Sequence, residues 1–156
     1  KKRTPKTYAT AFKDPEKAAR KPKAVELSAK DIANHPLKAD IEGLLEIGVR
    51  GLENPQNGNF LPAETVSRAE YAMMIEDILM KVSGDNTLAT KFIGSRSPFP
   101  DLRDSLPYFN AVMVVTTRGI MEARDVSTGE FAPLHPVPGV DALLMIRKVK
   151  EQLKFD

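Results

Sequence analysis

The sequence predicts an all-α fold made of two helix-loop-helix repeats, preceded by a basic N-terminal arm. The main observation is an internal repeat, because a shift of 71 residues aligns the two halves of the chain without a gap. Glycine and proline fix backbone geometry, so their coincidence at this shift indicates a shared fold and not only shared hydrophobicity. The identical pairs are Pro36 and Pro107, Gly48 and Gly119, Gly58 and Gly129, Phe60 and Phe131, Pro62 and Pro133, Val66 and Val137, Met74 and Met145, and Ile75 and Ile146.

Helical spacing of apolar residues predicts the first helix of each repeat. In the first repeat this helix can begin at Pro36, whose missing N–H would have no partner in a first turn, and Gly48 is placed to end it. In the loop that follows, we expect Phe60 and Pro62 to fill the space between the two helices of the repeat. The apolar residues on the helical face are Leu37, Ile41, Leu44 and Leu45.

The second helix of the first repeat opens with a capping-box pattern, Ser67-Arg68-Ala69-Glu70. The Ser67 hydroxyl can accept a hydrogen bond from the Glu70 N–H, while the Glu70 carboxylate accepts one from the Ser67 N–H. The second repeat has Pro138-Gly139-Val140-Asp141 at this place, so the cap is lost while the apolar stripe behind it is kept. That stripe comprises Ala72, Ile75, Ile78 and Val82, and in the second repeat Leu143, Ile146, Val149 and Leu153.

Residues 111–120 carry the β-branched composition of a strand, but they align with residues 40–49, which have helical spacing. We predict a helix, in agreement with the repeat. Residues 83–98 then form a connector, with a short turn of helix around Leu88–Phe92. The predicted organisation is an arm over 1–27, a first repeat over 28–82, the connector over 83–98, and a second repeat over 99–156.

Charge is distributed unevenly along the chain. Residues 1–27 contain nine Lys or Arg against three acidic residues, whereas residues 28–156 carry a net charge of −4. A basic arm of this kind binds an anionic partner or stays solvated. The arm offers only Tyr8 and Phe12 for base stacking and contains no nucleic-acid-binding motif, so we do not expect nucleic acid as the partner.

The composition argues against several classes of function. No apolar run approaches the ~20 residues of a membrane-spanning helix. The absence of cysteine excludes a disulfide framework and suits an oxidising compartment without requiring one. His35 and His135 do not coincide under the 71-residue shift and have no clustered carboxylates, which argues against a metal site. With no catalytic triad order, phosphate loop or zinc-protease motif, we expect neither enzymatic activity nor a cofactor.

Several motifs in order make the chain similar to S-layer homology (SLH) repeats over about residues 28–82 and 99–153. The first repeat contains Gly48-Val49 at a helix end, Gly58-Asn59-Phe60-Leu61-Pro62 in the loop, and Ser67-Arg68-Ala69-Glu70 at the next helix start. The acidic lead-in of the family is matched by Asp31 and Asp101. The resemblance implies a pseudo-threefold helical bundle, here incomplete because only two repeats are present.

The resemblance also implies a non-catalytic module of the bacterial cell envelope, located in the periplasm or at the cell surface. Such modules dock onto acidic cell-wall polysaccharide or peptidoglycan-linked polymer, and the motif arginine pairs with acidic groups of the glycan. That role passes to Arg68, with Ser67 and Glu70 beside it as candidate glycan-binding residues. The second repeat has Gly139 in place of the arginine.

Two alternatives stay open from the residues themselves. Helix capping explains Ser67 and Glu70 without any ligand. Arg68 is either a solvated side chain at a helix start or an anion-binding group, since capping needs no guanidinium. At the level of the whole chain, the alternative to glycan docking is a scaffold subunit of a larger envelope assembly, which uses the fold, and the basic arm, for protein contacts.

Overall fold

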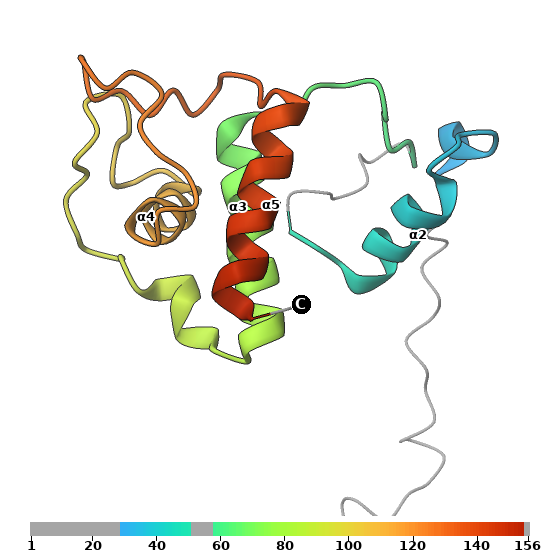
Figure 1. Cartoon of the computed structure of the whole chain (residues 1–156), viewed down its shortest axis with the longest axis horizontal. Coiled ribbons are helices and arrows are strands. Elements are labelled where there is room, and N and C mark those ends of the chain that lie inside the picture. The colour runs from blue at the N-terminus through green and yellow to red at the C-terminus, as the bar shows by residue number, and fades with distance from the viewer. Residues whose placement is uncertain (1–28, 51–57, 155–156) are drawn as a thin grey trace, which may run out of the picture.

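In the computed structural model, which describes residues 29–50 and 58–154, every regular element is helical (Figure 1). No strand forms within these ranges, and the one extended contact is an antiparallel bridge between Ser67 and Pro136. This confirms the all-α prediction, while the SLH-like pseudo-threefold arrangement stays a prediction. The arm predicted over 1–27 lies outside the described residues. The elements are η2 Lys30–Ile32, α2 Lys38–Ile47, α3 Arg68–Ser83, η3 Asn86–Thr90, α4 Phe109–Thr117 and α5 Gly139–Leu153.

The main core is built around α3 and α4, and α5 and η3 pack against this pair. The prediction of a helix within 111–120 is confirmed by α4, despite its β-branched residues. Val112, Val114 and Val115 are at most 1% exposed, so this short helix is buried around most of its circumference. A helix apolar on nearly all sides is the expected form for a segment enclosed by its neighbours.

The first helix, α2, stands beside α3 and α5 rather than inside the main core (Figure 1). It starts at Lys38, just after the predicted start at Pro36, and ends at Gly48 as predicted. Phe60 packs against a small cluster around this helix, but Pro62 is exposed, so its predicted filling role is wrong. The left-handed backbone of Leu61, with φ of 58°, turns the chain away from the helix after Phe60. The buried members of the cluster are Ala29, Ile32, Ile41 and Leu45.

Backbone geometry recurs at the 71-residue offset. Gly48 and Gly119, which follow α2 and α4, both have a left-handed backbone, with φ of 69° and 68°. Residues with a Cβ rarely adopt this conformation. Leu61 and Ala132 share the same conformation, with φ of 58° and 54°. The loops of the two units therefore share their backbone conformation at these equivalent positions.

A pair of lead-in carboxylates, Asp31 and Asp101, also repeats, with an offset of 70 residues in place of 71. Asp31 accepts hydrogen bonds from the N–H groups of Phe60 and Leu61, at 2.7 and 2.6 Å. Asp101 accepts from Phe131 and Ala132, the equivalents of Phe60 and Leu61, at 2.9 and 2.7 Å. Each carboxylate thus ties the start of its unit to the left-handed turn of its loop.

One prediction about the second apolar stripe is wrong. Leu143 and Ile146 are 62% and 43% exposed, although their equivalents Ala72 and Ile75 are buried. Val149 is buried as expected, at 7% exposure. The reason is positional, because α4 covers the corresponding face of α3 and no described element covers this face of α5.

Candidate functional site

The start of α3 places the first two candidate residues, Ser67 and Glu70. The Ser67 hydroxyl accepts from the Glu70 N–H at 3.2 Å, and the Glu70 carboxylate accepts from the Ser67 N–H at 2.8 Å. The predicted capping box is therefore present. Both side chains face their own helix terminus, and neither lines a pocket described below.

Arg68 lies one residue into the same helix, yet its side chain is only 8% exposed. Its Nε donates to the Phe131 carbonyl at 2.8 Å and its Nη2 donates to the Glu122 carbonyl at 2.5 Å. The guanidinium also lies over the Phe131 ring, 4.5 Å from the ring centroid, in a cation–π contact. The alternative of a solvated side chain is therefore wrong, because Arg68 joins the first unit to two points of the loop between α4 and α5.

The electrostatic surroundings of Arg68 are mixed. Burial lowers the pKa of its guanidinium from the ordinary value, and the nearby Arg124 cation acts in the same direction. Asp141 and Asp101 oppose this change by favouring the charged form. An arginine keeps its proton under all these influences, so the site carries a permanent buried cation.

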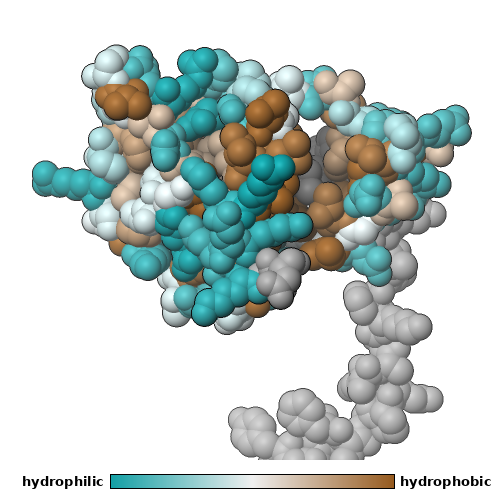
Figure 2. Space-filling view, in the orientation of Figure 1, coloured by the Kyte–Doolittle hydropathy of each residue, from teal (hydrophilic) through white to brown (hydrophobic). Residues whose placement is uncertain are grey.

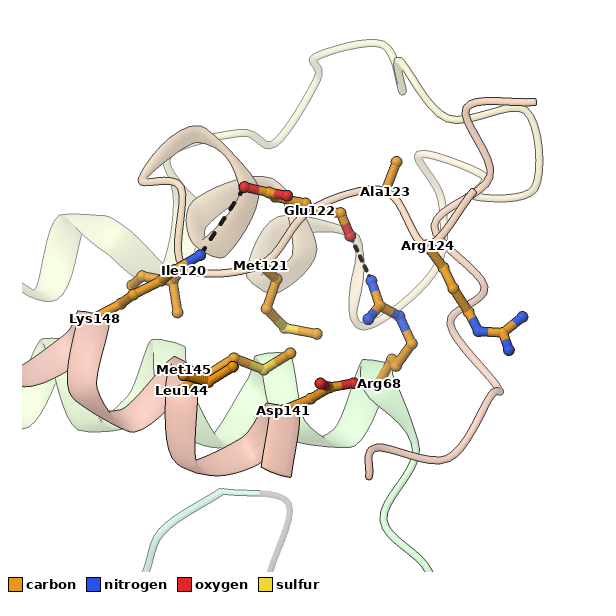
Figure 3. A pocket seen from close by; sticks show the side chains of 10 residues that line it. All are labelled: Arg68, Ile120, Met121, Glu122, Ala123, Arg124, Asp141, Leu144, Met145 and Lys148. Atoms are coloured by element: carbon orange, nitrogen blue, oxygen red, sulfur yellow. Dashed lines mark hydrogen bonds and ion pairs between the residues drawn. The ribbon is translucent and has the colours of Figure 1, made fainter. Parts of the chain in front are cut away.

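A pocket of about 270 Å³ opens beside Arg68, between the start of α3, the loop after α4 and one face of α5 (Figure 3). Lys148 reaches across it and forms an ion pair with Glu122 at 4.0 Å, and Arg124 stands at the rim with its side chain directed outward (Figure 3). Asp141 faces Arg68 from the first turn of α5. The lining residues are Arg68, Ile120, Met121, Glu122, Ala123, Arg124, Asp141, Leu144, Met145 and Lys148.

The chemistry of this lining suits a polar anionic ligand. The lining contains three cationic side chains and two carboxylates, which leaves a positive balance. Two of the three nitrogens of the Arg68 guanidinium have protein partners, and within residues 29–50 and 58–154 none is recorded for Nη1. Arg68 can thus hold the loop between α4 and α5 and still present N–H donors to a bound group.

Sequence reasoning identified Arg68 but missed the other charged members of the pocket. Lys148 and Arg124 align under the repeat shift with Asp77 and Glu53, so the repeat itself gave them no cationic counterpart. Asp141 was noted only as the equivalent of Glu70. The signal available in the sequence was helical spacing: residues 141, 144, 145 and 148 lie on one face of a helix, and they line the pocket together.

A second buried polar cluster lies away from this pocket. Glu76 is 1% exposed and accepts from Asn110 Nδ2 at 2.7 Å and from Arg50 Nη1 at 3.3 Å. Asn110 also donates to the Leu88 carbonyl, which fixes the connector against α3 and α4. Burial raises the pKa of Glu76, and its hydrogen bond to Asn110 and the charge of Arg50 counteract this only in part. We assign this cluster a structural role.

No group of three His, Cys, Asp or Glu side chains placed to hold a metal ion occurs in the described part of the chain. His35 bonds to its own turn through the Leu37 N–H, and His135 lies 3.0 Å from the Pro136 carbonyl. Within the same residues, no helix combines the length and the apolar character that a membrane crossing requires.

Comparison with known proteins gives one informative similarity. The chain is 32% identical over 97 residues to the surface-layer 125 kDa protein of Lysinibacillus sphaericus. The matched region covers 62% of this chain but only 7% of that protein. No family model matches the chain, and no solved structure matches it. A region of the chain is therefore similar to a small part of a surface-layer protein.

Proposed function

We propose that this chain is a non-catalytic cell-envelope module that docks onto acidic cell-wall polysaccharide or peptidoglycan-linked polymer. The observation that carries the proposal is the cationic pocket beside Arg68, at the junction of the two units. A surface location is supported by the similarity to a surface-layer protein and by the resemblance of its motifs to SLH repeats.

The pocket offers complementary groups to an acidic sugar. A ligand carboxylate can pair with Lys148 or with the rim cation Arg124, and a sugar hydroxyl can donate to Asp141 or Glu122. Leu144 and the other apolar side chains of the lining can contact the C–H face of the ring. Ser67 and Glu70 contribute indirectly, because their capping box fixes the helix start that carries Arg68.

We propose no reaction at this site. Glu122 is 79% exposed at its side chain and is paired with Lys148, and Asp141 belongs to the exposed first turn of α5. Catalytic acids and bases are usually held in buried surroundings or beside a close like charge, whereas these two carboxylates are exposed.

A second function is favoured by a separate observation. The apolar face of α5 around Leu143 and Ile146 is exposed, as expected of a subunit that meets another protein there. In this alternative the chain is a scaffold or accessory subunit of a larger envelope assembly. It needs no ligand in the charged pocket, so the two functions can be separated by experiment.

Cosedimentation with purified bacterial wall sacculi tests the docking proposal. We expect the chain to sediment with intact sacculi, and the bound amount to fall at least about tenfold after acid extraction of the wall-linked polymers. Binding should also weaken as salt rises, since exposed ion pairs are screened. Absent binding, or equal binding to extracted sacculi, would contradict docking, and recovery of the chain only within a larger complex would then favour the scaffold.

A further inference from the structure

One face of α3, the second helix of the first unit, is buried, whereas the equivalent face of α5 in the second unit is exposed. On α3, Ala69, Ala72 and Ile75 are each at most 2% exposed. Their equivalents on α5 are Val140, Leu143 and Ile146, which are 71%, 62% and 43% exposed. The exchange of two alanines for Val and Leu makes the open face more apolar than the covered one. An exposed apolar helix face of this kind marks an interaction surface.

The contact that covers α3 shows what such a face binds. The loop of the second unit lies at the helix start, where the Arg68 N–H donates to the His135 carbonyl at 2.9 Å and the Ala69 N–H donates to the Pro133 carbonyl at 2.8 Å. Beyond the loop, α4 packs along the helix. At the equivalent place on α5, the N–H groups of Gly139 and Val140 have no acceptor within the described ranges.

The loop of the first unit has the shape needed for the same contact. The Glu64 N–H donates to the Leu61 carbonyl at 3.0 Å, as the His135 N–H donates to the Ala132 carbonyl at 3.1 Å. The Pro62 and Glu64 carbonyls are equivalent to the two carbonyls that bind α3. In the described part of the chain neither accepts a hydrogen bond. Within the described residues, the N–H groups at the start of α5 and the carbonyls of the first loop are therefore both present and both without a partner.

An apolar groove of about 370 Å³ lies between α2, α3 and α5. Figure 2 shows apolar side chains bordering the hollow that separates α5 from α2. Leu44 of α2 faces this groove and is 38% exposed, whereas its equivalent Val115 is fully buried against α3. The lining residues are Leu44, Val49, Tyr71, Met74, Ile75, Ile78, Val82, Ile146, Val149, Lys150 and Leu153.

We propose that the open face of α5 binds the first unit of a second copy of this chain, through loop 60–66 and α2. The contact continues the interface between the two units, with the Gly139 and Val140 N–H groups donating to the partner's Glu64 and Pro62 carbonyls. The contact is heterologous, because two different surfaces meet. Each added copy leaves one such surface open at either end, so the oligomers grow longer as the concentration rises unless the copies close into a ring. Gly139 occupies the position equivalent to Arg68, so the contact between two copies lacks the arginine that holds the contact within one chain. Association is therefore reversible and weaker than the interface between the two units of one chain.

The charged pocket stays accessible in this arrangement. Its lining on α5 comes from Asp141, Leu144, Met145 and Lys148. The proposed interface uses Val140, Leu143 and Ile146, which do not line this pocket. Self-association and ligand docking can therefore fail independently of each other.

Sedimentation velocity over a concentration series tests the proposal on the full chain. We expect a mass above 17.2 kDa that rises with concentration. Leu143→Glu should weaken association at least about tenfold, since it places a charge where the proposed contact would bury a leucine. Val126→Glu is the matched control, because Val126 is 90% exposed and lies outside the groove. A monomer up to millimolar concentration, or equal loss in both variants, would overturn the proposal.

Cysteine pairing tests the geometry, because the chain has no cysteine of its own. Each variant carries one cysteine, so a disulfide can form only between two chains. Mixing Pro62→Cys with Val140→Cys under mild oxidation should give covalent heterodimers at least about five times faster than either variant gives homodimers, since proximity sets the rate. Pro62→Cys mixed with Val126→Cys is the control. No excess over that control would rule out the proposed contact.

Discussion

Among single residues, Arg68 connects the fold to the pocket. It binds two points of the loop between α4 and α5, the Phe131 and Glu122 carbonyls, and presents its remaining donors to the pocket. A change at this position therefore affects stability and binding together. Tests of ligand binding are cleaner at the exposed cations of the lining.

Arg68→Ala should destabilise the chain by about 2–4 kcal/mol, because it removes two charged hydrogen bonds and leaves two carbonyls without a partner. It also removes the cation–π contact with Phe131. Urea unfolding followed by circular dichroism measures the change. Arg68→Lys is the control: it keeps the charge but not the forked geometry, and should recover only part of the loss. If the free energy of unfolding of the alanine variant fell by less than about 0.5 kcal/mol, Arg68 would not hold the two units together as described.

Glu76 predicts a pH dependence of stability. Its folded-state pKa lies above the ordinary value of 4.5, chiefly because of burial. Its contribution to stability is complete below that ordinary value and is lost as pH rises through the raised pKa. We expect the free energy of unfolding of the wild type, relative to Glu76→Gln, to decrease as pH rises from 4.5. Denaturant unfolding at several pH values measures this difference.

Asp125→Asn provides a control of opposite sign. Hydrogen bonds from Ser127 lower the pKa of Asp125 below its ordinary value of 3.8. Its contribution is present above pH 3.8 and is lost as pH falls through the lowered pKa. The wild type should therefore lose its advantage over Asp125→Asn on acidification. A Glu76→Gln difference that followed this acid-side pattern would contradict the assignment of burial as the main cause.

At the level of helices and loops, the two units share a backbone but use different caps. The capping box begins α3, whereas α5 begins at Pro138 without a side-chain cap. Proline suits a helix start because its fixed φ is compatible with the first turn. The helix survives the loss of the cap, and packing of Met145 and Val149 against the core holds it in place.

Ser67→Ala should lower the free energy of unfolding by about 1 kcal/mol, the usual cost of a lost N-cap. Pro138→Ser should have the opposite effect, since it places an N-cap hydroxyl three residues before Asp141. Thermal unfolding of both variants measures these changes. Equal destabilisation by both would show that the starts of α3 and α5 are not controlled by capping.

Asp101→Ala should cost about 2–4 kcal/mol, since one carboxylate supports the Phe131 and Ala132 N–H groups. Asp101→Asn keeps an acceptor oxygen and should lose less. Asp31→Ala removes the equivalent pair of bonds in the smaller first cluster, where the carboxyl is exposed, and should cost less than Asp101→Ala. Denaturant unfolding ranks the three variants, and a larger loss from Asp31→Ala would contradict this order.

For the whole molecule, the sequence repeat was sufficient to predict the helical class and most helix positions. Gly48 and Gly119 fixed the helix ends, and the repeat corrected the strand-like appearance of residues 111–120. The exposure of Leu143 could not be predicted, because it depends on which unit covers which face. A local pattern specifies a helix and its apolar side but not the neighbour that buries it.

The candidate site was predictable only in part for the same reason. Arg68 was identified because a cation at a helix start needs an explanation beyond capping. Lys148 and Arg124 come from separate segments that only the packing of α5 and the loop after α4 brings beside α3. These side chains come close to Arg68 only in the tertiary structure, so no local sequence pattern indicates their proximity.

We propose that the cationic pocket beside Arg68 holds the acidic wall polymer. The most direct test compares sacculus binding of the double variant Arg124→Glu, Lys148→Glu with that of Arg103→Glu, Arg96→Glu, which changes the charge equally outside the pocket. The pocket variant should bind at least about tenfold more weakly than the control variant, as expected for the loss of charged contacts with the ligand. Equal weakening of the two would show that binding follows net charge alone and would contradict the assigned site.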